Sequence, residues 1–268
     1  MIRLIASDLD GTLLEPVEHL PEGLFETLEK LHSLGIVFAA ASGRQYDNLR
    51  RLFAPAAAHM GFICENGALN VLGGEAIKLQ PIERSMALDL IHHLQKMPVS
   101  ILVSGRHCCY VSPENRAFTD DIIYRLRNTT AVVEHLDQLA DEYLKISVFS
   151  PDGVASFAKE LEDAWGSKLH ALVSGRCWFD FGTASKATGI HALMEKLQIG
   201  KEEVVAFGDQ FNDVSMLDAV GHPFIMDTAS DALKSRGYHL CHKVLPVLQY
   251  IADHEGSLEG YTPSLKNC

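Results

Sequence analysis

The sequence predicts an α/β protein with a doubly wound core around a parallel sheet and an α+β module inserted into that core. Between residues 3 and 64, short apolar runs alternate with amphipathic helical patterns, which is typical of strands buried on both faces of a parallel sheet. The same texture returns after residue 185, whereas the strands between these parts alternate partly in polarity. We therefore expect a core of residues 1–81 and 185–268 and an inserted module of residues 82–184.

The first part of the core is expected to alternate strands and helices. The segment LPEGLFETLEKLHSLG places Leu24, Leu28 and Leu31 on one helical face and ends at Gly35, a common helix stop. Continuously apolar runs lie on either side of it, and a second amphipathic segment follows. The expected elements are strands at 3–7, 36–41 and 61–64 and helices at 20–35 and 46–53.

The same reasoning applies to the inserted module and to the second part of the core. Mixed polarity in the module indicates strands with one solvated face and with helices on the other. We expect strands within 100–113, 143–150, 168–174 and 177–182, and helices at 85–97 and 154–165. The second part of the core is expected to contain a helix at 185–200, a buried strand at 202–208 and a helix at 212–221.

Composition excludes several classes of partner. The 268 residues carry a formal net charge of −12, which repels both nucleic acid and anionic membrane surfaces. No apolar run approaches the roughly 20 residues of a spanning helix, and no separate signal region precedes the first strand, so we expect a cytoplasmic protein. An anionic substrate would then need a local source of positive charge.

The cysteines show no CxxC pairing, so they predict neither a zinc site nor a disulfide framework. The 13 histidines also lack a ligand pattern, and we expect surface or packing roles for them. Reduced, mostly buried thiols are the expected state of Cys64, Cys108, Cys109, Cys177, Cys241 and Cys268.

Polar side chains follow four of the predicted strands. Because parallel strands joined by right-handed crossovers deliver their carboxyl ends to one edge of the sheet, these side chains should meet there. They comprise carboxylates, hydroxyls, amides and an arginine. The residues are Asp8, Asp10, Gly11 and Thr12 after the first strand, Ser42, Gly43 and Arg44 after the second, Glu65 and Asn66 after the third, and Asp209, Asn212 and Asp213 after the late strand.

Like charges crowded at one edge raise each other's pKa unless a cation intervenes. Oxygen ligands without His or Cys favour a hard ion, and Mg²⁺ takes few carboxylates while keeping water and phosphate oxygens in its shell. We interpret Asp8, Asp10 and Asp209 as a magnesium site. The groups suited to binding a phosphate are the Ser42 hydroxyl, the backbone amides of Gly11 and Gly43, and Lys186.

Four motifs, in their order along the chain, resemble the haloacid dehalogenase superfamily of aspartate-nucleophile phosphatases. They are DLDGT at 8–12, AAASGR at 39–44, a lysine at 186 that opens a helix, and VVAFGDQFND at 204–213. The long insert before that lysine, together with ENGALN at 65–70, resembles the subgroup with an α+β cap, often called the Cof type. The resemblance implies a core and cap of that fold, Mg²⁺ as cofactor, and a monomer or homodimer that acts on a small phosphate ester.

The resemblance also implies a role for each matching residue. Asp8 would be the nucleophile that forms an aspartyl phosphate, and Asp10 would act as general acid and then as general base. Ser42 and Lys186 would hold the transferring phosphoryl oxygens. The implied metal site comprises Asp8, Asp209, the backbone carbonyl of Asp10 and, in support of metal and lysine, Asp213; the further substrate or phosphate contacts are Gly11, Thr12, Gly43, Arg44 and Asn212.

Some of these residues have a purely structural alternative. Ser42 could cap the following helix, and Arg44 could form an ion pair within the core. Lys186 lies near Lys196 and Lys201, and a lysine near a helix start is commonly a solvated side chain.

We expect a Mg²⁺-dependent phosphatase for a small phosphorylated metabolite, with sugar phosphates as the first class to consider. A phosphomutase of the same fold and a phospho-accepting regulator similar to receiver domains remain as alternatives. The long insert and Asp10, which would speed breakdown of the intermediate, argue against the regulator. Within the insert, Arg106, His107 and Arg176 are candidate substrate contacts.

Overall fold

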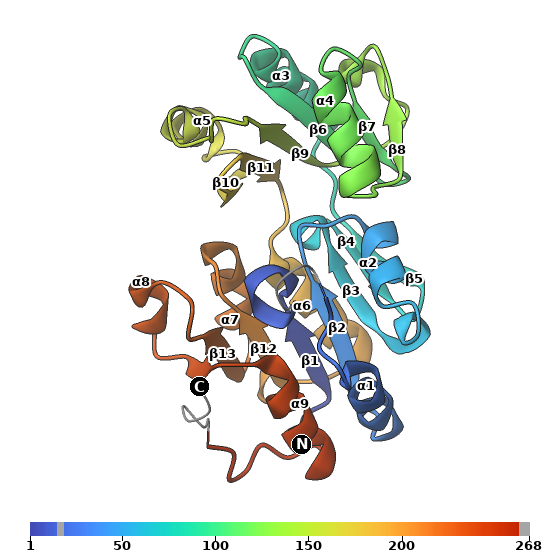
Figure 1. Ribbon diagram of the computed structural model, residues 1–268, viewed down its shortest axis with the longest axis vertical. Coiled ribbons are helices and arrows are strands. Elements are labelled where there is room, and N and C mark those ends of the chain that lie inside the picture. Colours follow the sequence, from blue (N-terminus) through green and yellow to red (C-terminus); the bar gives the residue numbers. More distant parts are fainter. Residues whose placement is uncertain (15–18, 263–268) are drawn as a thin grey trace.

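The computed structural model describes residues 1–14 and 19–262, which form two sheets stacked along the long axis of the molecule (Figure 1). The chain passes from the first sheet to the second and back through two neighbouring segments. Gln80 Nε2 donates a hydrogen bond of 2.7 Å to the Thr183 carbonyl, and Thr183 Oγ1 donates one of 3.2 Å to the Gln80 carbonyl. These bonds hold the two crossings side by side.

The first sheet has eight strands in the order β14-β13-β12-β1-β2-β3-β4-β5. All neighbours from β14 to β3 run parallel, whereas β4 and β5 are antiparallel additions at one edge. The strands are β1 (Leu4–Ser7), β2 (Val37–Ala41), β3 (Gly61–Cys64), β4 (Leu69–Leu72), β5 (Glu75–Leu79), β12 (Val204–Gly208), β13 (His222–Met226) and β14 (His239–Cys241).

Helices cover both faces of this sheet, so the predicted doubly wound core is confirmed. Successive residues of a strand point to opposite faces, and in β1 the side chain of Ile5 joins one apolar layer while Leu4 joins the other. The first layer includes α1 (Leu24–Ser33), α2 (Tyr46–Leu52) and α9 (Val244–Asp253). The second includes α6 (Lys186–Leu197), α7 (Val214–Leu217) and α8 (Asp231–Lys234).

The second sheet has six strands in the order β10-β11-β9-β6-β7-β8, and every neighbouring pair except β7 and β8 is antiparallel. Its strands are β6 (Ser100–Gly105), β7 (Cys109–Val111), β8 (Thr130–Val132), β9 (Tyr143–Phe149), β10 (His170–Gly175) and β11 (Trp178–Gly182). These strands lie within the segment 82–184, whose role as a separate substrate-selecting domain stays a prediction.

The helices of the second sheet do not all lie on one face as expected. Helices α3 (Arg84–Leu94) and α5 (Ala158–Trp165) pack on the face away from the first sheet. A further helix, α4 (Arg116–Asp120), continues into the π-helical turn η4 (Asp121–Arg125) and packs on the opposite face through Phe118 and Ile122. Part of the face expected to be solvated is therefore covered.

Two features of the core also differ from the sequence expectation. The hairpin of β4 and β5 was not expected, although its turn contains Gly73 and Gly74, both with positive φ, a common hairpin signal. The helix expected at 212–221 is shorter, because a 3₁₀ turn, η7 (Phe211–Asp213), precedes a helix that ends at Leu217.

Two absences concern the described residues only. None of their helices is both long and apolar enough to cross a membrane. Their cysteines, Cys64, Cys108, Cys109, Cys177 and Cys241, are free thiols, whereas Cys268 lies outside the described residues.

Candidate active site

The carboxyl ends of β1, β2, β3 and β12 meet at the edge of the first sheet that faces the second sheet (Figure 1). Asp8, Ser42, Glu65 and Asp209 follow these four strands directly. The polar side chains that were expected to meet at one sheet edge are therefore brought together by the topology.

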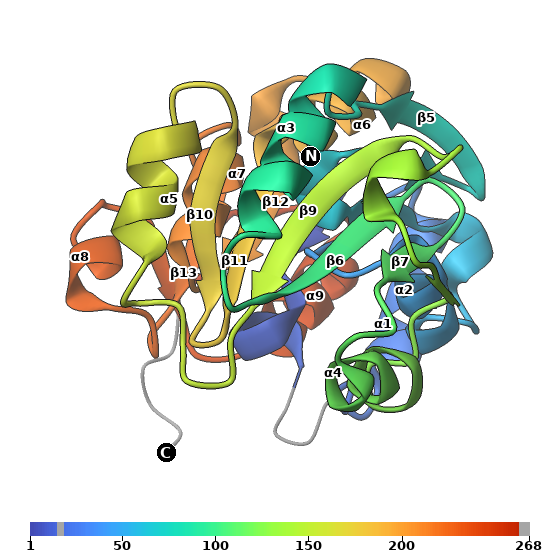
Figure 2. The same ribbon diagram turned by 90° about the horizontal axis from the view of Figure 1, so that it is seen from above.

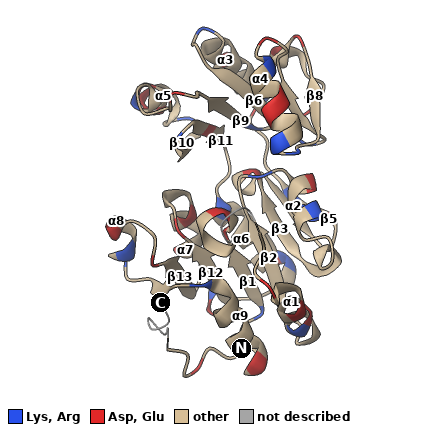
Figure 3. Ribbon diagram, in the orientation of Figure 1, with Lys and Arg blue, Asp and Glu red and all other residues tan. Residues whose placement is uncertain are grey.

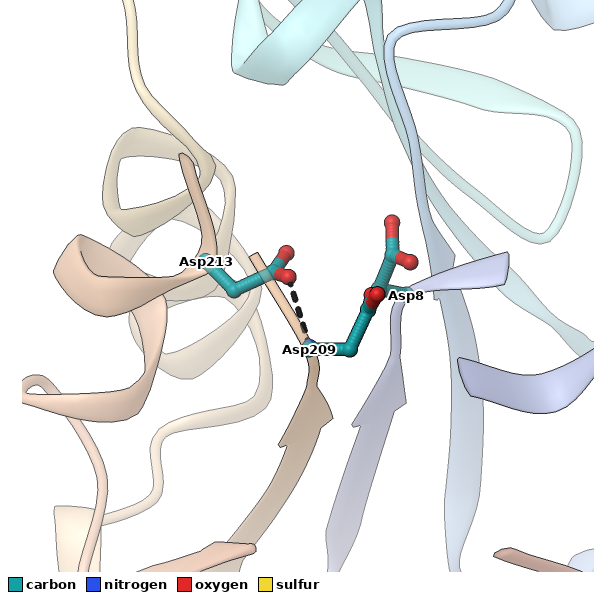
Figure 4. Close-up of side chains that lie close together, drawn as sticks. All are labelled: Asp8, Asp209 and Asp213. Atoms are coloured by element: carbon teal, nitrogen blue, oxygen red, sulfur yellow. Dashed lines mark hydrogen bonds between the residues drawn. The ribbon is translucent and has the colours of Figure 1, made fainter. Parts of the chain in front are cut away.

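Three carboxylates form a buried cluster at this edge (Figure 4). Asp8, Asp209 and Asp213 each offer an oxygen, and these oxygens all lie within 4.8 Å of one another. All three side chains are buried, and Asp213 is 0% exposed. So much negative charge out of water is costly unless positive charge compensates it.

Lys186 supplies part of that compensation. It is the first residue of α6, and its side chain is 1% exposed. Its ammonium group donates to Asp8 Oδ1 and, at 2.5 Å, to Asp213 Oδ1. The two carboxylates raise the pKa of Lys186 against the opposing effect of burial, so the amine stays charged. The alternative of a solvated surface lysine does not apply to this residue.

The start of α6 is fixed by close packing. Ser185 and Thr188 form a capping box there, in which the Thr188 hydroxyl accepts the Ser185 N–H at 3.2 Å. Gly67, in the turn after β3, has φ +100°, and a Cβ at this position would collide with the Ser185 carbonyl. Only glycine allows this approach, which holds Lys186 against the carboxylate cluster.

Asp213 holds its neighbours in place. One oxygen accepts from Lys186, and the other accepts the backbone N–H groups of Asp209 and Gln210, both at 3.0 Å. Asp213 therefore ties Lys186 to the backbone that follows β12.

Asp209 is oriented by two side chains. Thr12 Oγ1 donates to Asp209 Oδ1 at 2.9 Å, and Gln210 Nε2 donates to Oδ2 at 2.9 Å. Gly11 has φ +89°, and a Cβ there would collide with the Asp209 carboxylate, so this turn also requires glycine. The Thr12 hydroxyl is buried against Asp209, and neither Gly11 nor Thr12 lies in the wall of the cavity described below.

The electrostatics of the cluster fit a divalent cation. Burial raises the pKa of Asp8 to about 8, because the lowering effect of Lys186 is offset in part by Asp213 and Asp209. Burial likewise raises the pKa of Asp209, although Thr12 and Gln210 favour its charged form. The donor atoms of the cluster are all oxygens, and Lys186 balances only part of their negative charge. A hard ion such as Mg²⁺ would balance the rest.

The Asp10 carboxylate lies outside this cluster. Arg44 binds it with two hydrogen bonds, Nε to Oδ2 at 3.0 Å and the terminal NH₂ to Oδ1 at 2.5 Å. The Asp10 side chain is 57% exposed and borders the cavity, as does Arg44. The ion pair considered for Arg44 is therefore present, and it lies at the border of the site.

Ser42 is buried at the end of β2. Its N–H donates to the Ile63 carbonyl at 2.8 Å, and its hydroxyl accepts the Arg44 N–H at 3.2 Å. Ser42, Gly43 and Asn212 all lie in the cavity wall. Ser42 does not cap α2, because the N-cap residue of that helix is Gln45 and the Arg44 amide lies before it. Ser42 borders the space in which a ligand could sit.

A cavity of about 1280 Å³ separates the two sheets, and Asp8 lies in its wall. Basic residues gather around it although the chain as a whole is acidic. Figure 3 shows basic positions at the end of the helical segment that begins with α4, on the side of the second sheet that faces the first. The basic residues of the wall, which outnumber its carboxylates Asp8, Asp10, Glu65 and Asp180, are Arg44, Arg51, Arg125, Arg127, Lys145 and Arg176.

A polar network in the same wall joins the two sheets. Lys145 of β9 donates to the Gly43 carbonyl at 2.6 Å and lies 3.0 Å from Glu65 Oε2 and 3.5 Å from Asp180 Oδ2. Asn66 Nδ2 also donates to Asp180 Oδ2, at 3.1 Å. Lys145 and Asp180 were not anticipated, although each is a charged residue at a position of an otherwise apolar strand, which is a usable signal.

The candidate contacts of the insert separate into two groups. Arg176 lies in the cavity wall. Arg106 and His107 do not, since Arg106 pairs with Glu142 at 3.5 Å and His107 Nδ1 lies 3.0 Å from Asp141 Oδ1.

Comparison with known proteins agrees with the resemblance indicated by the four motifs. A family model described as haloacid dehalogenase-like hydrolase matches residues 5–244. A 5-amino-6-(5-phospho-D-ribitylamino)uracil phosphatase of Escherichia coli is 27% identical over 268 residues, 96% of this chain and 99% of the relative. A pyridoxal phosphate phosphatase of the same species is 26% identical over 255 residues, 87% of this chain and 91% of the relative.

Solved structures share the fold. A haloacid dehalogenase-like hydrolase from B. subtilis matches with a TM-score of 0.79 at 23% identity, over 93% of this chain and 100% of that chain. The likeness extends over both sheets, because it covers nearly the whole of both chains.

Proposed function

The chain belongs to the haloacid dehalogenase-like hydrolase family and is a phosphoric monoester hydrolase, and from this premise we propose that it is a Mg²⁺-dependent phosphatase whose Asp8 carries the phosphoryl group. One observation supports the proposal most strongly. Asp8 is buried at the end of β1 and held by Lys186, while it still borders the cavity between the sheets. A fixed carboxylate that faces a substrate-sized space is positioned to act as a nucleophile.

In the first step an Asp8 oxygen attacks phosphorus, and the bond from phosphorus to the ester oxygen breaks. Lys186 restrains Asp8 during this displacement, and Ser42 and the basic cavity wall bind the other phosphoryl oxygens. The product of the step is an aspartyl phosphate on Asp8 and the free alcohol of the leaving group.

Asp10 moves the protons in both steps. It gives a proton to the leaving alkoxide, and then takes one from the water that attacks the aspartyl phosphate and releases inorganic phosphate. Its position supports this role, because its carboxylate borders the cavity and is more exposed than that of Asp8. The paired Arg44 holds the carboxylate in place.

The residues that would hold Mg²⁺ are Asp8, Asp209 and the backbone carbonyl of Asp10, with Asp213 in support. A bound Mg²⁺ would supply the positive charge that allows an anionic carboxylate to approach an anionic phosphate. Thr12 and Gln210 keep Asp209 oriented for that purpose.

We assign the substrate to the sugar phosphates and related phosphorylated metabolites of the cytoplasm. Acceptor groups in the cavity wall support this, since Glu65 and Asp180 lie there and Asn66 Oδ1 is buried without a hydrogen-bond partner. Substrate hydroxyls are the donors that such a wall would bind. The two curated relatives described above are named for small phosphorylated metabolites as well.

Phosphate release from a panel of sugar phosphates, nucleotides and phosphorylated cofactors tests the proposal. We expect wild-type protein to release phosphate with Mg²⁺ and not with EDTA, and the Asp8→Asn variant to release none in either case. Release that survives EDTA or Asp8→Asn would contradict the assignment. An isomerised ester in place of free phosphate would instead favour the phosphomutase.

A further inference from the structure

Phe211 exposes an aromatic ring beside the carboxylate cluster. Its side chain is 64% exposed and lies in the cavity wall, within the turn that also carries Asp209 and Asp213. Because consecutive Cα atoms are about 3.8 Å apart, the Cα of Phe211 lies within about 7.6 Å of the Cα atoms of Asp209 and Asp213. A large apolar ring is thus exposed in the same cavity wall as Asp8.

The backbone that carries this ring is fixed. Asp213 accepts the N–H groups of Asp209 and Gln210 through its carboxylate, and its own N–H donates to the Gln210 carbonyl at 3.0 Å. Phe211 therefore lies in a turn that is bonded on both sides of it. An exposed ring on a constrained turn can bind a ligand with little loss of backbone entropy.

The opposite wall of the cavity also has an aromatic surface. Trp178 of β11 lies in that wall and packs beside Phe149 and Phe118, with ring centroids 5.0 Å and 5.9 Å away. Both views show the β10–β11 hairpin above the end of β12, from which the Phe211 turn begins (Figures 1 and 2). The cavity thus has aromatic residues on both sheets, in addition to its polar network.

We propose that Phe211 is a specificity-determining residue that stacks against a planar ring of the leaving group. The substrate is then a phosphorylated sugar or sugar alcohol that carries an aromatic heterocycle. Its hydroxyls bind the acceptor groups of Glu65, Asn66 and Asp180, and its ring lies on Phe211 with Trp178 on the facing side. This inference rests on the proposed phosphatase function and narrows its substrate class.

An aromatic ligand explains the exposed ring of Phe211 better than an aliphatic ligand does. Aromatic pairs gain energy from offset or edge-to-face contact beyond the area they bury, and a heterocycle offers such a face. A bare sugar phosphate has no aromatic face to pair with Phe211, whereas a ring-bearing ester has one.

Two matched pairs of esters test the inference. Riboflavin 5′-phosphate and ribitol 5-phosphate share one polyol phosphate and differ by a ring system, and UMP and ribose 5-phosphate share one sugar phosphate and differ by a base. We expect wild-type kcat/KM for at least one ring-bearing ester to exceed that of its ringless partner. The Phe211→Ala variant should lower that value by about tenfold or more, mainly through KM, because base–aromatic stacking contributes about that much.

Three comparisons make the test specific. Phe211→Ala should leave the ringless esters within about twofold, since their phosphate chemistry is unchanged. Phe211→Tyr should restore turnover of the ring-bearing ester, because the ring face is restored. Tyr124→Ala removes another exposed aromatic side chain, 73% exposed and outside the cavity wall, and should change neither class.

The outcomes separate this inference from the function on which it rests. Hydrolysis of ringless and ring-bearing esters with equal kcat/KM, or an equal loss for both in Phe211→Ala, would overturn the role of Phe211 and leave the phosphatase intact. Absence of Asp8-dependent release from every ester would overturn the phosphatase, and this inference with it.

Discussion

At the scale of single residues, the charge balance of the site depends on Lys186. Three buried carboxylates, Asp8, Asp209 and Asp213, face this one buried ammonium group, which contacts two of them. The arrangement leaves negative charge to be balanced by a cation. It also gives the lysine a part in stability as well as in chemistry, since its removal would leave charges buried without a partner.

Replacing Lys186 by Ala should lower kcat/KM by about a hundredfold or more, a loss typical of removing one preorganised donor from a charge-stabilising site. Lys196→Ala is the matched control, because Lys196 lies on the same helix with an exposed side chain. It should keep wild-type activity. Steady-state kinetics on both variants, with thermal unfolding to establish that they fold, checks the expectation. Equal losses in the two variants would refute the placement of Lys186.

The raised pKa of Asp8 predicts a pH-dependent response to metal. Burial raises the pKa of Asp8 to about 8 in the folded protein, so the folded chain holds a proton that the unfolded chain releases above its ordinary value of 3.8. The contribution of Asp8 to the stability of the metal-free protein therefore falls as the pH rises from 3.8 to about 8. Protons also compete with the metal for the same carboxylate, so metal binding strengthens over that range.

We accordingly expect Mg²⁺ to raise the melting temperature, and to raise it more at about pH 8 than at about pH 6, because more of the cluster is ionised at the higher pH. Thermal unfolding with Mg²⁺ and with EDTA at the two pH values measures this without reference to activity. Asp209→Asn should abolish the shift. A shift of the same size at both pH values, or one retained in Asp209→Asn, would argue against a metal site at this cluster.

At the scale of elements, sequence patterns predicted the strands that are buried in the middle of the parallel sheet. Continuous apolar runs identified β1, β2, β3 and β12, and the topology of parallel strands then brought Asp8, Ser42 and Asp209 to one edge. The hairpin of β4 and β5 was missed because β5 is largely exposed and alternates polar with apolar residues, while β4 is buried but only four residues long. The 3₁₀ turn before α7 was missed because Asp213 bonds the backbone there and shortens the helix.

Lys145 is a buried contact between the two sheets. Its ammonium group reaches the Gly43 carbonyl, Glu65 and Asp180, so one side chain of β9 binds the loops after β2 and β3. Asp180 and Glu65 raise its pKa despite burial. The partners are far apart in sequence, and no local pattern indicates which of them meet.

Replacing Lys145 by Met should lower the free energy of unfolding by about 3–5 kcal/mol, because two carboxylates would remain buried without their partner. Lys159→Met is the control, since Lys159 is exposed and pairs with Asp163 at 3.0 Å on one helix, and we expect no measurable change from it. Urea unfolding of both variants checks the difference. Equal stability would show that the contacts of Lys145 contribute nothing to folding.

At the scale of the whole molecule, an acidic protein forms a cavity with a basic wall. The net charge of −12 predicted no polyanionic partner, and it required a local source of positive charge for a small anionic substrate. Arginines that line the cavity from both sheets provide it, among them Arg44 and Arg176. Composition predicted the need for that charge. The residues that meet it depend on how the second sheet lies over the first, which is a tertiary property.

The central claim is that Asp8 forms a covalent phosphoryl intermediate. The measurement that tests it most directly is acid quenching after mixing with ³²P-labelled p-nitrophenyl phosphate, whose leaving group needs little help from a general acid. In Asp10→Asn, breakdown of the intermediate should slow by about a hundredfold or more, so labelled protein should accumulate. We predict that the label is released by hydroxylamine and is absent when Asp8→Asn is added to Asp10→Asn. Equal labelling with and without Asp8, or phosphate release that requires Asp8 while no label binds the protein, would contradict the account.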